Sequence, residues 1–131
     1  MNDAYVDKFS LLIQETSQRT GTYLPHKIES YLTYLLASHV ERADFFRDPV
    51  ALRYMSLSSH HSAKDLGDNC LVIAGIFSGL RGMDDSYYVN IGRGSYHVAA
   101  DATGSEIFER LADDFVEYKR FLNQIGPPRY F

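Results

Sequence analysis

The sequence predicts an all-α fold, a single-domain bundle of five or six helices packed around a central buried helix at about residues 60–81. The longest apolar run of the chain, residues 70–77, lies in this central segment. At roughly 100° per residue its side chains would point in every direction, so other elements must cover the helix on all sides. Apolar residues also recur every three or four positions over 25–40 and 104–125, which is the helical period.

Composition limits the class of protein and its partners. The chain has 131 residues and is 45% hydrophobic, which suffices for one core without a disulfide or a structural metal. The net charge is -4 and no segment is strongly basic, so nucleic acid and anionic membrane are not expected partners. Because neither a signal peptide nor a membrane-spanning run is visible, we expect a cytoplasmic protein. The domain is expected to cover residues 1–126, followed by an extended tail over 127–131.

The first half of the chain contains three helix start signals. Asp3 is a suitable N-cap for a first helix over residues 3–19. Pro25 begins a second helix that extends to about residue 40, because proline at the first helical position loses no hydrogen bond. An Asp-Pro pair at 48–49 precedes a short third helix at about 50–57. This helix either ends at the following serines or continues into the central one.

Residues 85–100 predict a fifth helix, although 86–98 also fits a β-hairpin that turns at Gly92 and Gly94. The helix is favoured because four residues, three of them small, fall on one face at helical spacing: Tyr88, Gly92, Ser95 and Ala99. The central helix has its own small pair, Gly75 and Gly79, at the same spacing. We therefore expect these two helices to cross with their backbones close together.

The last predicted helix covers residues 104–125. Thr103 and Glu106 match a capping box, in which Thr is the N-cap and Glu is the third helical residue. Apolar residues from Phe108 to Ile125 follow at intervals of three and four. They predict a continuous stripe that faces the core.

One group of residues has the character of a metal site. His61, Asp65 and Asp68 lie at i, i+4 and i+7 of the central helix, within roughly 60° of one face. An imidazole and two carboxylates are ligands for Zn, Fe or Mn, and the neighbouring His60 extends the group. The favoured alternative is an ordinary solvated helix face, since acidic residues are common in the first turns of a helix. No cofactor is predicted.

Two other chemically versatile residues are expected to be structural. His39 lies on the apolar face of the second helix, where a hydrogen-bonded core histidine is commoner than a ligand. Cys70 begins the buried apolar run, so we expect it to pack as a small apolar side chain.

Tyrosine and arginine, which are enriched at protein interfaces, cluster late in the chain. The candidate interface residues are Tyr87, Tyr88, Arg93, Tyr96, Tyr130 and Phe131. The alternative is that the tyrosines are core residues whose hydroxyl groups reach the surface.

These patterns favour a non-enzymatic interaction or oligomerisation module that docks a protein partner or a second copy of itself. The alternative is a small metal- or cofactor-dependent helical enzyme that uses the His61, Asp65 and Asp68 cluster. The first hypothesis is preferred because no complete catalytic constellation is visible in the sequence.

Overall fold

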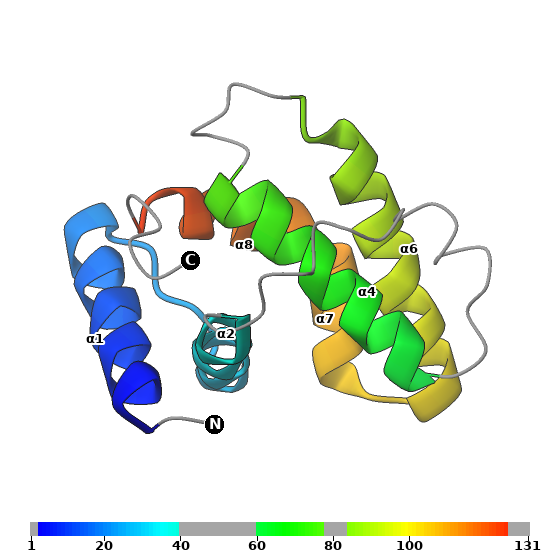
Figure 1. Cartoon of the computed structure of the whole chain (residues 1–131), viewed down its shortest axis with the longest axis horizontal. Helices are drawn as coiled ribbons and strands as arrows, with labels where there is room; N and C mark the ends of the chain where they lie inside the picture. The colour runs from blue at the N-terminus through cyan, green and yellow to red at the C-terminus, as the bar shows by residue number, and fades with distance from the viewer. Residues whose placement is uncertain (1–2, 40–59, 78–83, 126–131) are drawn as a thin grey trace.

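A computed structural model describes residues 3–39, 60–77 and 84–125, and there the chain forms six α-helices and one π-helical segment (Figure 1). The α-helices are α1 (Asp3–Thr20), α2 (His26–His39), α4 (His60–Val72), α6 (Ser86–Thr103), α7 (Glu106–Asp113) and α8 (Phe115–Asn123). This helical bundle confirms the predicted fold class. The third helix at 50–57 and the tail at 127–131 lie outside the described residues, and the domain boundary stays a prediction.

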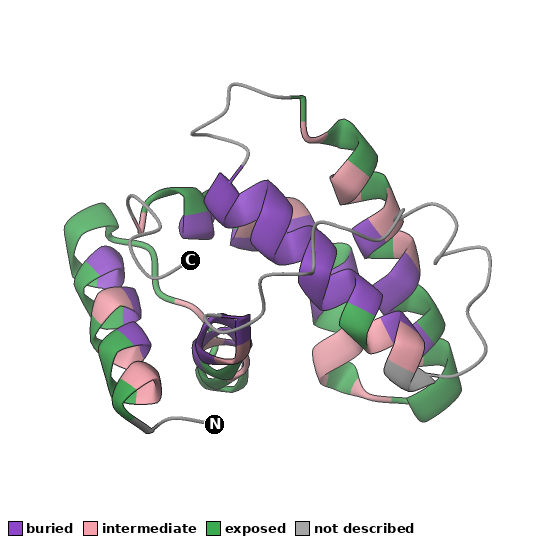
Figure 2. Ribbon diagram, viewed as in Figure 1, coloured by how far each residue is buried: buried purple, intermediate pink, exposed green. Residues whose placement is uncertain are grey.

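Helix α4 is the centre of the bundle, as the apolar run predicts. Its last two turns and the π-helical segment Ile73–Phe77 are buried on every side (Figure 2). Helix α6 packs along α4, α8 packs against the π-helical segment, and α1 packs against α2 at the edge of the bundle (Figure 1). A helix that is apolar all round is thus enclosed by its neighbours, which removes its side chains from water.

The central helix changes its winding where we expected a regular α-helix as far as residue 81. After Val72 the backbone continues as a π-helix to Phe77, and the rest of the predicted helix lies outside the described residues. Gly75, in the middle of this segment, touches α8: a Cβ atom there would lie 2.7 Å from the Leu122 Cβ atom. A glycine at this position therefore lets α8 approach the backbone.

The close approach of α4 and α6 is confirmed, but with different contacts from those expected. Gly92, Ser95 and Ala99 are buried on α6, as predicted. A Cβ atom on Gly92 would lie 2.6 Å from the Phe115 ring and 2.9 Å from the Cys70 Cβ atom. Gly75 does not face these residues, since it meets Leu122 instead, and Gly79 lies outside the described residues.

Residues 86–98 are helical throughout, so the hairpin alternative is wrong. At the start of α6, the Asp84 Oδ1 atom accepts hydrogen bonds from the Ser86 backbone N–H at 3.0 Å and from the Ser86 hydroxyl at 2.7 Å. At its end, Gly104 adopts a left-handed conformation with φ 70°, and its N–H donates to Ala100 O. This is the standard termination that glycine makes possible.

The last helix differs from the prediction in two ways. Its N-cap is Ser105 and not Thr103, because the Ser105 side chain accepts from the Phe108 N–H. Thr103 belongs to the end of α6, where its hydroxyl donates to Ala99 O at 2.7 Å. The chain also breaks at Asp114 (φ -107°, ψ 22°), which divides the predicted helix into α7 and α8.

Within the described ranges, no helix is both long enough and apolar enough to cross a bilayer.

We expect Gly92→Ala to destabilise the bundle. The new methyl group would overlap the Phe115 ring, and overpacking of a core typically costs about 1–3 kcal/mol. Alanine recovers about 1 kcal/mol of helix propensity, so the net loss should be smaller than the steric cost alone. Urea unfolding followed by circular dichroism measures it.

Asn90→Ala is the matched control, because Asn90 is exposed on the same helix. It should keep or raise the free energy of unfolding. Equal stability of Gly92→Ala and Asn90→Ala would contradict the close packing of α6 on α4 and α8.

Candidate functional site

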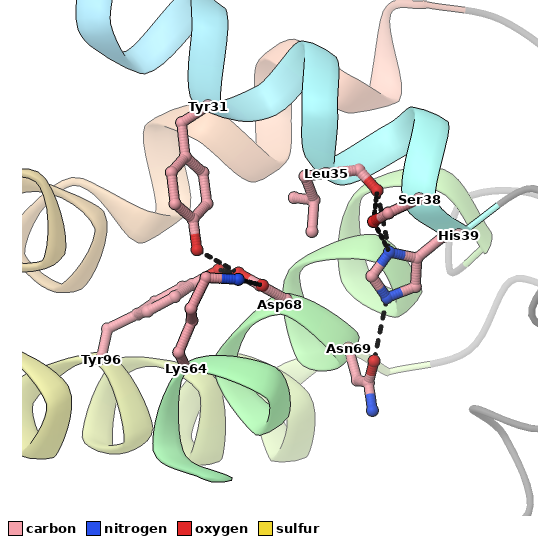
Figure 3. A network of polar contacts seen from close by, with 8 residues as sticks. All are labelled: Tyr31, Leu35, Ser38, His39, Lys64, Asp68, Asn69 and Tyr96. Atoms are coloured by element: carbon pink, nitrogen blue, oxygen red, sulfur yellow. Dashed lines mark hydrogen bonds and ion pairs between the residues drawn. The ribbon is translucent and has the colours of Figure 1, made fainter. Parts of the chain in front are cut away.

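The Asp68 carboxylate is the polar centre of the fold. Asp68 is only 4% exposed, and its Oδ1 atom accepts hydrogen bonds from the Tyr31 hydroxyl at 2.7 Å and the Tyr96 hydroxyl at 2.6 Å (Figure 3). Its Oδ2 atom accepts from the Lys64 ammonium group at 2.7 Å. The donors come from α2, α6 and α4 itself. A buried carboxylate is stable only when such donors replace its water, so the four side chains form one unit.

A glycine makes this arrangement possible. Gly67 is on α4 next to Asp68, and a Cβ atom there would lie 2.8 Å from two carbon atoms of the Tyr96 ring. The ring therefore lies directly on the α4 backbone, and its hydroxyl reaches the carboxylate of the following residue. Tyr96 is fully buried and also stacks against Phe108, with ring centroids 6.5 Å apart.

Both tyrosines are hydrogen-bond donors at neutral pH. Burial raises the pKa of Tyr31 well above its ordinary value, and the negative charge of Asp68 raises it further. The pKa of Tyr96 is raised by the same causes in the same order. Since a phenolate beside a buried carboxylate is disfavoured, neither hydroxyl serves as a general base near pH 7.

Lys64 is partly exposed to solvent. Its side chain is 38% exposed, whereas the side chain of Asp68 is 6% exposed. The ammonium nitrogen also lies 5.4 Å from the centre of the Tyr31 ring, within the range of a cation–π contact. The ion pair and the ring together fix the position of the ammonium group.

A hollow opens beside this cluster, between α2 and α4. Its volume is about 220 Å³, and it is lined by Tyr31, Tyr34, Leu35, Ser38, Lys64 and Asp68. Tyr34 is 53% exposed at this hollow. The Ser38 hydroxyl donates to Leu35 O at 2.9 Å. The hollow thus combines apolar walls with a preorganised ion pair.

A second polar contact joins α2 to α4. His39 is 1% exposed, with Nδ1 2.8 Å from Leu35 O and Nε2 2.9 Å from the Asn69 Oδ1 atom (Figure 3). This confirms the prediction of a hydrogen-bonded core histidine. The Asn69 Nδ2 atom is buried, without a hydrogen-bond partner in the part of the chain described. When the His39 ring is neutral and donates from Nδ1 to Leu35 O, its Nε2 atom is an acceptor. The Asn69 side chain then satisfies both groups when its amide is turned so that Nδ2, and not Oδ1, faces Nε2.

The predicted metal ligands are not all placed by the structure. Asp65 is exposed, whereas Asp68 is buried and bonded to Tyr31, Tyr96 and Lys64. The side chain of His61 lies outside the described residues, so the three-residue site stays a prediction. Among the described residues, no three His, Cys, Asp or Glu side chains are placed to share a metal ion. Cys70 is buried, as expected.

The predicted interface residues separate into different environments. Tyr87 is 48% exposed and Tyr88 is half-buried, and their rings meet edge to face with centroids 5.2 Å apart. Arg93 is exposed, and its Nε atom donates to Ala112 O at 3.3 Å. Tyr96 is fully buried, which corrects its assignment to a surface cluster.

The remaining two interface candidates, Tyr130 and Phe131, lie outside the described residues. Sequence reasoning also missed Tyr31 and Lys64 as partners of Asp68. The contact of Lys64 with Asp68 was predictable from the sequence, because Lys64 lies four residues before Asp68 on one helix. The contacts of Tyr31 and Tyr96 with Asp68 were not predictable from local spacing, since these residues are 37 and 28 positions away in the chain.

Comparison with known proteins does not add to this geometry. No protein-family model matches the chain, and neither a curated protein nor a solved structure is significantly similar to it.

We expect Asp68→Asn to lower the free energy of unfolding by about 2–3 kcal/mol. The amide oxygen can still accept from both tyrosine hydroxyls, but the NH₂ group would face the Lys64 ammonium group. Asp65→Asn, an exposed neighbour, should change stability by no more than about 0.5 kcal/mol. Urea unfolding of both variants is the test, and equal effects would contradict the central role of Asp68.

Stability should fall above pH 10. In the unfolded chain the tyrosines ionise near pH 10, whereas in the folded protein the pKa values of Tyr31 and Tyr96 are raised. The folded state therefore holds these two protons more tightly. The contribution of these two tyrosines to the free energy of unfolding is fully present below about pH 10. Above this pH it decreases by up to about 1.4 kcal/mol per pH unit for each tyrosine.

Urea unfolding at a series of alkaline pH values measures this slope. Tyr31→Phe should reduce it, whereas Tyr34→Phe, which changes an exposed tyrosine of the same helix, should retain the wild-type slope. A wild-type slope in Tyr31→Phe would contradict the tyrosine assignment.

Proposed function

We propose that the protein is a non-enzymatic interaction module that associates with a second copy of itself through the exposed face of α6. The observation that carries the proposal is a second apolar stripe on this helix. Tyr87, Ile91, Gly94 and Val98 are spaced by four, three and four residues, so they lie within about 60° of one another. We call this set the α6 stripe.

The α6 stripe is centred on a different side of the helix from the face that α6 buries in its own bundle, and Ile91 at its edge also packs against the core. The buried residues Gly92, Ser95, Tyr96 and Ala99 are centred about 120° away around the helix. Tyr87 and Val98 are 48% and 38% exposed, and Figure 2 shows the outward side of α6 as exposed or intermediate. A helix with two apolar faces supports packing against a second partner, because a solvated helix face is normally polar.

The order of residues in the stripe favours a second copy as the partner. Gly94 lies between Ile91 and Val98, three residues after the one and four before the other. Two antiparallel α6 helices that cross at Gly94 would bring Ile91 of one copy beside Val98 of the other. The same patch would thus serve both subunits, as a two-fold interface requires. A single-helix interface is small, so we expect a weak dimer.

Sedimentation velocity over a wide range of protein concentration tests this proposal. The wild type should shift from monomer to dimer as concentration rises, and Val98→Lys should weaken the association by at least about tenfold. Leu11→Lys is the matched control, because Leu11 is an exposed apolar residue on α1. A wild type that stays monomeric, or an equal effect of Leu11→Lys, would contradict the proposal.

A further inference from the structure

We propose that the hollow between α2 and α4 binds an uncharged small molecule that carries a primary carboxamide on a flat apolar body. This inference is independent of self-association. The lining residues belong to α2 and α4, and none of them belongs to the α6 stripe.

Three described donors reach the Asp68 carboxylate, two at Oδ1 and one at Oδ2. An ionised carboxylate has about four lone-pair positions, two on each oxygen. The two tyrosine hydroxyls occupy both positions on Oδ1, and Lys64 occupies one position on Oδ2. Among the described residues, one acceptor position therefore remains without a donor on Oδ2. Asp68 lines the hollow and 6% of its side chain is exposed, so the proposal places this remaining position of Oδ2 towards the hollow.

The Lys64 ammonium group has more donors than the one that bonds to Asp68. An ammonium group has three N–H donors, and one of them bonds to Asp68 Oδ2. Its side chain is 38% exposed and also lines the hollow. In the proposed complex the ligand therefore meets a donor on Lys64 and an acceptor on Asp68, with the Nζ and Oδ2 atoms 2.7 Å apart. A primary carboxamide carries the matching pair, a carbonyl acceptor and an N–H donor on neighbouring atoms.

Charge distinguishes the carboxamide from its charged relatives. The ion pair of Lys64 and Asp68 is neutral as a unit, and the charge of Asp65, which also reaches Tyr31, is exposed and therefore screened by solvent. A ligand carboxylate could accept from Lys64, but it would bring a second negative charge against Asp68 and has no donor for Oδ2. An amidinium could donate to Oδ2, but it would bring a second positive charge against Lys64. Like charges this close in a partly buried site are repulsive, so the neutral group is preferred.

The walls determine the remainder of the ligand. The rings of Tyr31 and Tyr34 and the Leu35 side chain supply apolar surface. At about 220 Å³ the hollow is smaller than the roughly 300–1,000 Å³ of clefts that enclose drug-sized ligands. The space therefore suits one ring with its substituent, and a larger cofactor would not fit within it.

Three isosteric probes test the inference: benzamide, benzoate and benzamidine. They share a ring and differ in the group offered to Lys64 and Asp68. Chemical shift changes in the ¹⁵N-labelled full-length protein should locate benzamide at Leu35, Ser38, Lys64 and Asp68. We expect a dissociation constant on the order of 1 mM, as is usual for so small a ligand. Benzoate and benzamidine should bind at least about fivefold more weakly.

Two pairs of variants connect the binding to the hollow. Tyr34→Ala should weaken benzamide binding at least about threefold, whereas Tyr23→Ala, which removes an exposed tyrosine outside the hollow, should not change it. Lys64→Met should abolish the preference for benzamide, with Lys27→Met as the control. If Lys64→Met does not fold, the probe series and the tyrosine pair still decide the question. Absence of benzamide binding, or equal binding of benzoate, would overturn the inference.

Discussion

The hydrogen bonding of one buried carboxylate is the constraint on which the arrangement of the bundle depends. Asp68 is at the centre of α4, where an ionised group without partners would be strongly unfavourable. Its partners come from three helices: Tyr31 on α2, Lys64 on α4 and Tyr96 on α6. Apolar packing alone tolerates small shifts of one helix along another, but hydrogen bonds of 2.6–2.7 Å do not. The network therefore fixes the register of α2 and α6 on α4.

Glycines supply the space that this register requires. Gly67 lets the Tyr96 ring lie on the α4 backbone, and Gly92 lets α6 approach Cys70 and the Phe115 ring. Each glycine costs about 1 kcal/mol of helix propensity relative to alanine. That cost is offset where the close approach brings a buried hydroxyl to Asp68 or encloses an aromatic ring. The two glycines and the polar network therefore depend on the same close packing of α6 on α4.

Some polar groups of the network bond only within the fold, whereas others can also contact a ligand. The Tyr31 and Tyr96 hydroxyls are committed to Asp68, and their raised pKa values keep them protonated. The partly exposed Lys64 ammonium group and the remaining acceptor position of Asp68 are the groups that we propose to bind a ligand. Helix α6 shows a similar division, because Tyr96 faces the core while Tyr87 and Val98 face solvent. The two proposed binding surfaces are thus the outward sides of elements that the core holds in place.

The sequence by itself determined the helical class, the central position of residues 70–77 and the burial of His39 and Cys70. These follow from periodicity and from local start and stop signals, which act over a few residues. Tertiary structure alone decided which groups meet Asp68, because Tyr31 and Tyr96 are far from it in the chain. It also decided that Gly75 faces Leu122, that Tyr96 is buried and that the last helix breaks at Asp114. Periodicity identifies the face of a helix that is covered, but the identity of the covering residue depends on how distant helices pack.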